Sequence, residues 1–195
     1  MRNLQNVVLI LSALFGLVAC GPSFQFAKRP QPSALKGMQK IALTTLSYDG
    51  LMIGKKTFDE YIAGKAADKD DESAAKWTAN KATWKKNVTE IITGKLKGAG
   101  IAASEVAKPA DAQGGLVLLM SVEFIEPGFY VGVASRPSET HVHVTIADAA
   151  KPNEAIYDFV AMSRTSGYST GGRVGDDLDR IAGQIAKFLI AEING

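Results

Sequence analysis

The strongest strand pattern in the sequence is Leu116-Val117-Leu118-Leu119-Met120-Ser121-Val122-Glu123-Phe124-Ile125. Alternate residues of a strand point to opposite faces of a sheet, and the first half of this stretch is apolar at both sets of positions. A strand that is apolar on both sides is typical of a strand covered on both faces. We therefore expect a central strand here, ended by Glu126-Pro127-Gly128.

The regions around this strand predict further strands and two helices. Apolar residues at spacings of three and four predict amphipathic helices over 73–98 and from Asp176 to the end of the chain, with 163–175 as a polar loop before the second. Shorter runs of alternating or β-branched residues predict further strands at 38–48, 101–106, 129–134, 140–147 and 155–164. This order predicts an α+β fold, a single mostly antiparallel sheet with two main amphipathic helices packed on one face.

The composition fits one domain with an ordinary core. The chain has 195 residues, of which 46% are hydrophobic, and a formal net charge of +2. One domain of this length buries a substantial core. A charge so close to zero provides no basic surface for nucleic acid, so we expect no nucleic-acid partner.

The N-terminus has the order of a secretory signal. Arg2 precedes an apolar run over 7–19, which leads into Leu17-Val18-Ala19-Cys20. This motif resembles the lipobox of bacterial lipoproteins. The resemblance implies that residues 1–19 are removed and that Cys20 carries acyl chains, which leaves no free thiol. The alternatives are a transmembrane anchor, for which the apolar run is short, and a secreted protein with an unrelated cysteine.

The lipobox implies a domain order and a location. Residues 20–37 are rich in Pro, Ser and Gln and predict a lipidated cysteine followed by an extended tether, so that 38–195 form a single periplasmic α+β domain. Phe24 and Phe26 in this tether either dock on the domain or lie at the lipid interface. Gly21 takes the place of the Asp that retains many such lipoproteins at the inner membrane, so the resemblance favours the outer membrane, facing the periplasm.

Three side chains are candidates for a binding surface. His141 and His143 alternate with Val142, so both imidazoles lie on one face of a strand. Arg173 lies in the glycine-rich stretch 167–175, which lacks the Gly-Lys-Ser/Thr of a phosphate loop. A metal at the histidine pair would need further ligands, such as Asp148 or Asp158. We assign no catalytic residue, no metal and no cofactor.

The second half of the chain resembles the uncharacterised bacterial lipoproteins of family DUF4410. The similarity lies in Gly115-Leu116-Val117-Leu118, in Val142-x-Val144-x-Ile146-x-Asp148, in the Ser/Gly-rich stretch 163–175 and in Ile181-Ala182-x-x-Ile185-Ala186. A departure is the turn 149–153, which replaces the Thr-Gly usual there. The family has no assigned catalytic residues, so the resemblance implies none here.

These patterns favour a non-enzymatic envelope lipoprotein. Anchored to the membrane by Cys20, the domain would bind a partner protein or another envelope component through the face with His141 and His143, or through 167–175. The alternative is an auxiliary lipoprotein of a transport system that carries a lipid or small hydrophobic ligand in a pocket between helix and sheet, lined by residues such as Trp77, Trp84 and Phe124. A metal-dependent enzyme at the histidine pair is a third hypothesis.

Overall fold

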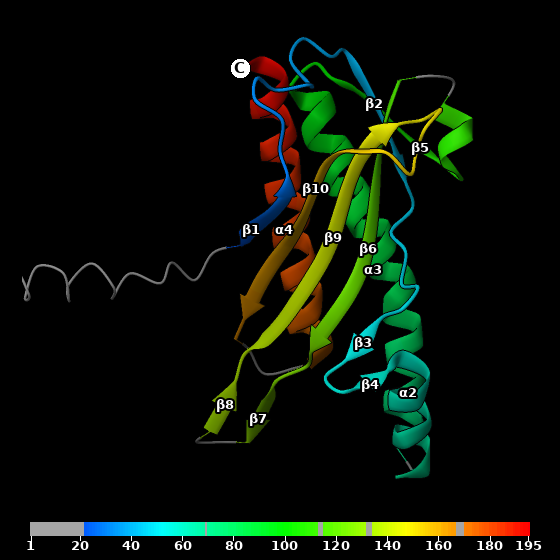
Figure 1. The fold of residues 1–195 in the computed structure, drawn as a ribbon. Helices are drawn as coiled ribbons and strands as arrows, with labels where there is room; N and C mark the ends of the chain where they lie inside the picture. Colours follow the sequence, from blue (N-terminus) through cyan, green and yellow to red (C-terminus); the bar gives the residue numbers. More distant parts are fainter. Residues whose placement is uncertain (1–21, 69, 113–114, 132–133, 167–169) are drawn as a thin grey trace, which may run out of the picture.

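The computed structural model describes residues 22–68, 70–112, 115–131, 134–166 and 170–195. Cys20 and the predicted signal peptide, 1–19, lie outside the described residues. The described chain folds into one eight-stranded sheet, a separate two-stranded hairpin and three α-helices (Figure 1). The predicted α+β class and the single mostly antiparallel sheet are confirmed.

The main sheet has six strands in a row and a small hairpin beside it. From one edge to the other, the row is β1 (Ser23–Lys28), β10 (Ala155–Thr165), β9 (Ser138–Asp148), β6 (Leu116–Glu126), β2 (Lys40–Thr44) and β5 (Ala102–Val106). The first four strands pair antiparallel, and β2 pairs parallel with both β6 and β5. The strand β6 is central, as its two-sided apolar pattern predicts.

Two short hairpins extend the sheet at one end. In the first, β3 (Met52–Ile53) pairs parallel with β6 and antiparallel with β4 (Lys56–Thr57). The second hairpin, β7 (Phe129–Val131) with β8 (Ala134–Arg136), continues from β6 and β9 beyond the sheet (Figure 1). Gly128 allows the turn into β7, because its φ is 64° and a Cβ there would lie 2.3 Å from the Arg136 carbonyl oxygen.

The helices cover one face of the sheet. The long helices α3 (Asp71–Gly98) and α4 (Thr170–Asn194) lie side by side behind the strands, and α2 (Phe58–Ala67) packs on α3 (Figure 1). A capping box starts α2, because the Thr57 hydroxyl accepts from the Glu60 amide and the Glu60 carboxylate accepts from the Thr57 amide. None of the described helices has the length and apolarity needed to cross a membrane.

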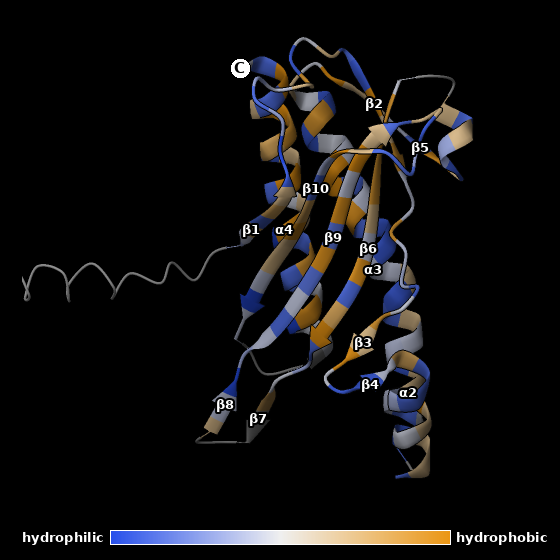
Figure 2. Cartoon of the chain, viewed as in Figure 1, coloured by the Kyte–Doolittle hydropathy of each residue, from blue (hydrophilic) through white to orange (hydrophobic). Residues whose placement is uncertain are grey.

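The core fills the layer between helices and sheet. On β9, Val142, Val144 and Ile146 alternate with half-exposed residues and are buried. From the helix side, Ile92, Leu96, Ile181, Ile185 and Leu189 are fully buried against them. Burying each such side chain stabilises the fold by about 1.5–3 kcal/mol before entropy is counted. Figure 2 shows this alternation as bands of hydrophobic and hydrophilic residues along the strands.

The segment after Pro22 belongs to the domain, so the expected tether over 20–37 is wrong for its described part. Residues 23–28 form the edge strand β1, and Phe24 and Phe26 dock on the domain through Phe159 and Phe188, with ring centroids 5.0–5.8 Å apart. Leu35 is 1% exposed, within the main core. Leu35 is buried because of tertiary contacts, which the Pro-rich composition of the segment does not predict.

Polar contacts fix the same segment to the C-terminal end of α4. The Arg29 guanidinium lies 2.6 Å from the Glu192 carboxylate, and the Tyr157 hydroxyl donates to the other Glu192 oxygen at 2.7 Å. Burial favours the neutral carboxyl, but hydrogen bonds from Tyr157, Arg29 and Ser33 outweigh it and hold the pKa of Glu192 below its usual range. The charged carboxylate therefore helps to hold the N-terminal segment in place.

The final helix starts earlier than the sequence predicts. We expected a polar loop over 163–175, whereas β10 runs to Thr165 and α4 begins at Thr170. The glycines lower helix propensity but allow α3 to approach closely. A Cβ on Gly171 would lie 2.7 Å from the Asn80 amide nitrogen, and one on Gly175 would lie 3.1 Å from the Trp84 indole nitrogen. Close helix packing thus outweighs the local preference.

Candidate functional site

The face of the sheet opposite the helices carries the candidate site. We call it the open face, and it is formed by side chains of β6, β9 and β10. The register places His143 between Ser121 and Val160, and His141 between Phe124 and Met162. Half-buried and exposed side chains gather here: Ser121, Glu123, Glu139, His141, His143, Thr145, Asp158, Val160, Met162 and Arg164.

His143 lies between two carboxylates from the neighbouring strands. Its Nε2 is 2.7 Å from the Asp158 carboxylate on β10, and its Nδ1 is 3.1 Å from the Glu123 carboxylate at the bulge of β6. A neutral imidazole has one N–H and donates to one of these acceptors, whereas an imidazolium donates to both. The ring is therefore held in place with a carboxylate at each of its two nitrogens.

Glu139 joins the second histidine to an arginine. The carboxylate lies 2.8 Å from His141 Nε2 and accepts from Arg164 Nε at 2.9 Å. Partial burial favours the neutral carboxyl, but the hydrogen bonds from His141 and Arg164 outweigh it and hold the pKa of Glu139 below its usual range. The Phe124 ring packs on the His141 ring at 5.1 Å between centroids. The two histidines thus belong to two adjacent polar clusters that share one face.

The two clusters do not form a metal site. Among the residues that the structure describes, no three His, Cys, Asp or Glu side chains converge to hold a metal ion. Asp158 lies beside His143 as the metal hypothesis requires, but it contacts the ring nitrogen itself. Asp148 is at the end of β9, where it accepts a hydrogen bond from the Ala150 amide at 2.8 Å. Asp158 is therefore a hydrogen-bond partner of the His143 imidazole, whereas the contact of Asp148 is to a backbone amide.

Arg173 does not belong to this surface. It is 2% exposed in the first turns of α4, and its Nη2 donates to the Pro127 carbonyl oxygen at 3.0 Å. The burial of this side chain gives no support to the prediction of Arg173 as part of a binding surface. Because Pro127 precedes Gly128 at the turn into β7, Arg173 connects the start of α4 to the end of β6. Its role in the described structure is to position these elements.

A buried carboxylate near the same end of α4 also has a structural role. Asp177 is fully buried and accepts from the Ser138 hydroxyl at 2.6 Å and from the Thr165 hydroxyl at 2.8 Å. Burial raises the pKa of Asp177, although these hydroxyls partly oppose the effect. The contacts join α4 to β9 and β10 from the helix side, behind the open face.

The side chains that would line a carrier pocket are not together. Trp77 and Trp84 pack edge to face at 5.7 Å between centroids and belong to the buried core. Phe124 lies on the opposite face of the sheet, against His141. A groove of about 710 Å³ borders the two tryptophans, but helix residues alone line it, including Asn80, Asn87, Asp176 and Asp179. The three aromatic side chains therefore line no common pocket between helix and sheet.

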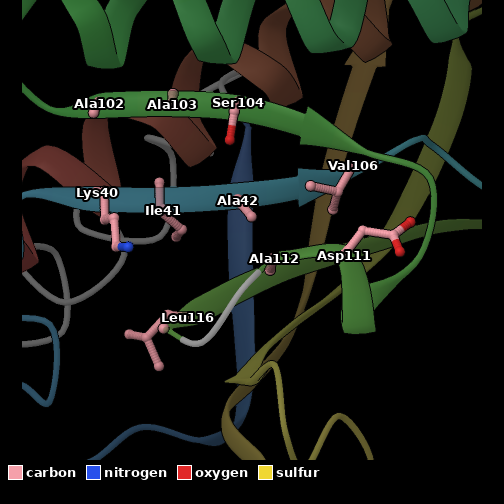
Figure 3. A pocket seen from close by; sticks show the side chains of 11 residues that line it. Lys40, Ile41, Ala42, Ala102, Ala103, Ser104, Val106, Asp111, Ala112 and Leu116 are labelled. Carbon is pink, nitrogen blue, oxygen red and sulfur yellow. The ribbon is translucent and has the colours of Figure 1, made fainter.

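A smaller hollow lies at the β2–β5 end of the sheet. Its volume is about 360 Å³, and Figure 3 shows Lys40 and Ala42 of β2, Ser104 of β5 and Asp111 around it. Asp111 belongs to η1 (Pro109–Ala112), a short 3-10 helix that lies beside β5 and β6. Most of the lining side chains are small and aliphatic. The hollow has fewer converging polar groups than the open face.

The sequence predicts the two histidines as surface candidates but does not predict most of their partners. Alternation along one strand places His141 and His143 on one face. Glu123, Glu139 and Arg164 join them because of the strand register and one bulge. The available signal was alternation of charged residues in the neighbouring strands, but pairing them requires the register, which one sequence does not specify.

Comparisons with known proteins give structural likeness only. No family model and no curated protein matches the sequence, so the resemblance to DUF4410 stays a prediction. The fold is similar to that of PelC from Paraburkholderia phytofirmans, crystallised as a dodecamer, with 11% identity, TM-score 0.46 and coverage of 89% of this chain and 99% of that one. It is also similar to a Xanthomonas campestris protein of the DUF330 family, with 8% identity, TM-score 0.44 and coverage of 85% and 91%. Scores this low carry no argument about function or assembly.

Proposed function

We propose that the chain is a non-enzymatic outer-membrane lipoprotein, anchored by acylated Cys20, whose periplasmic domain binds a partner protein through the open face. The lipobox over Leu17-Val18-Ala19-Cys20 supports the anchor, and Gly21 supports the outer membrane over the inner one. The open face supports the binding role.

The observation that carries the binding role is the organised charge on an uncovered sheet face. Glu139, His141, His143 and Arg164 are held at 2.7–2.9 Å from their partners, so they lose little side-chain freedom when a partner docks. Functional sites on strands are more precise than sites on loops. A polar, mixed-charge surface fits a protein partner of complementary charge better than an apolar ligand.

The distribution of exposed apolar residues agrees with a polar interface. Among the described residues, the large exposed hydrophobic side chains are Phe26, at 37%, and Phe129, at 48%. Phe26 lies on the edge strand β1 and Phe129 on the hairpin strand β7, so the two form no patch on the open face. The domain would therefore select its partner by charge pattern, which gives specificity and rate more than raw affinity.

Two measurements test the proposal. The intact mass of the protein from the membrane fraction should begin at Cys20 with added acyl chains, and C20S should lose both features. A photo-crosslinking amino acid at Thr145, on the open face, should give a discrete adduct in cells. The same probe at Lys86, exposed on α3, is the matched control.

The outcomes separate the anchor from the binding role. An unmodified mass contradicts the anchor and the location. An adduct of equal yield from Lys86 and Thr145 contradicts the open face as the binding surface. A Thr145 adduct that E139A weakens supports it, because Glu139 fixes both His141 and Arg164.

A further inference from the structure

The structure leaves very little chain between the anchor and the folded domain. Only Gly21 and Pro22 separate Cys20 from Ser23, the first residue of β1. Three Cα steps at about 3.3–3.6 Å each span about 10 Å. The polar layer of a leaflet is about 5–8 Å thick, since the bilayer is about 40–45 Å and its core about 30 Å. An acylated Cys20 therefore brings the start of β1 to the headgroups.

The strand β1 has a free edge and an exposed aromatic ring. It pairs with β10 on one side and lies at the end of the sheet, so no described strand pairs with the backbone groups on its other side. The Phe26 side chain is 37% exposed, packs against Phe159 and Phe188, and lies 5.1 Å from the Arg29 guanidinium carbon. An aromatic ring beside a cation suits the boundary between lipid and water.

The charge of the segment is one-sided. Between positions 22 and 48 the charged residues are Lys28, Arg29, Lys36 and Lys40, and the first acid after them is Asp49. Arg29 pairs with Glu192, and the Lys28 ammonium contacts the Ala155 carbonyl oxygen, while Lys36 is exposed. Basic residues close to an anionic leaflet each add attraction of about 1 kcal/mol. Of these residues Lys28 lies on β1, whereas Lys40 lies on β2, four strands along the sheet, so Lys28 is the one that would complement lipid phosphates at the β1 edge.

We propose that the β1 edge is a membrane-facing surface, with Phe26 at the lipid boundary and Lys28 at the phosphate level. This inference rests on the proposed acylation of Cys20. The occupant is the bilayer that takes the acyl chains, because the connecting chain is too short to leave room for a second domain between them. The main sheet then stands with its β1 edge on the membrane and its β5 edge away from it.

The orientation predicts different lipid contact for the two sheet edges. Five strand spacings separate β1 from β5, which at about 4.8 Å each is about 24 Å. Gln25 on β1 and Ser104 on β5 are both exposed. Neither takes part in the aromatic contacts of Phe26 or in the two histidine clusters of the open face. The variants Q25C and S104C therefore form a matched pair for labelling, since an acylated Cys20 has no thiol.

The test uses the full lipidated protein in vesicles of phosphatidylethanolamine and phosphatidylglycerol. Each variant carries an environment-sensitive fluorophore, and a nitroxide-labelled phospholipid serves as quencher. We expect severalfold stronger quenching of the Q25C label than of the S104C label. F26C provides a second position on β1, and its label should be quenched at least as strongly as that of Q25C.

Each outcome bears on the inference. Equal quenching at Gln25 and Ser104, with acyl chains present by intact mass, overturns the membrane-facing edge and leaves the proposed anchor standing. A mass without acyl chains overturns both. If the Q25C emission instead follows the protein density in the vesicles and ignores the lipid quencher, a second copy covers β1, and the inference is wrong.

Discussion

Replacing Leu35 by alanine tests whether the N-terminal segment is part of the core. Leu35 is 1% exposed, and the segment around it is held by the Gly37 amide, which donates to the Ile193 carbonyl oxygen at 2.9 Å. A buried Leu→Ala change costs about 2–5 kcal/mol, less where the surroundings can collapse into the cavity. Leu35 lies in an irregular segment that can shift, so we expect the lower part, about 2–3 kcal/mol.

The assay is chemical and thermal unfolding of residues 20–195 with Cys20→Ser, which keeps the domain in water. For a domain of this size, each 1 kcal/mol shifts the melting temperature by about 2–4 °C, so L35A should melt roughly 4–12 °C lower. The neighbouring K36A is the control, because Lys36 is exposed and should stay within about 0.5 kcal/mol. An L35A variant as stable as K36A would refute the reasoning and restore a free tether.

Four further substitutions test other contacts. In α4, G183A should stabilise the domain by about 0.5–1 kcal/mol, because its new Cβ meets no atom closer than 3.7 Å. The Cβ of G175A would lie 3.1 Å from the Trp84 indole nitrogen, so this variant should gain less stability or lose some. Equal gains of the two variants in thermal melts would contradict close packing of α3 on α4. A residue other than glycine at a positive φ usually costs about 1–3 kcal/mol of strain. G128A should destabilise the domain by more than this, because its Cβ would also collide with the Arg136 carbonyl oxygen. An unchanged melting temperature would contradict the described turn. The pKa of Glu192 is lowered in the fold, so its contribution is present above the unfolded pKa of about 4.3 and is lost as pH falls through the folded value. E192Q should therefore be less stable at neutral pH and lose less stability on acidification, and parallel pH profiles from denaturant titrations would contradict this.

Local periodicity predicted the elements that build the core. The two-sided apolar pattern of β6, the alternation of β9 and β10 and the stripes of α3 and α4 all depend on residues close together in the sequence. The strand β1 was missed because it has no core of its own. It is stable only on β10, where Phe26 pairs with Phe159, more than one hundred residues later. A strand that depends on such long-range pairing has only a weak strand pattern in its own sequence.

The site was predictable along one strand and not across strands. Alternation placed His141 and His143 on one face, but their contacts with Glu123, Asp158 and Arg164 depend on the register of three strands. Arg173 was misplaced for the opposite reason. Its glycine-rich surroundings are typical of a loop, and the close approach of α3 to α4 that makes them helical is a tertiary property.

The position of β1 constrains where a partner can come from. The sheet order places β9, which carries both histidines, two strands from β1, and two spacings of about 4.8 Å amount to about 10 Å. If β1 lies on the bilayer, the sheet and its open face extend away from the membrane surface. A partner that contacts His141 and His143 must then itself reach to within about 10 Å of the membrane-facing edge. A membrane-embedded or membrane-anchored protein meets this condition without further structure, so it fits the open face better than a partner that diffuses freely through the periplasm.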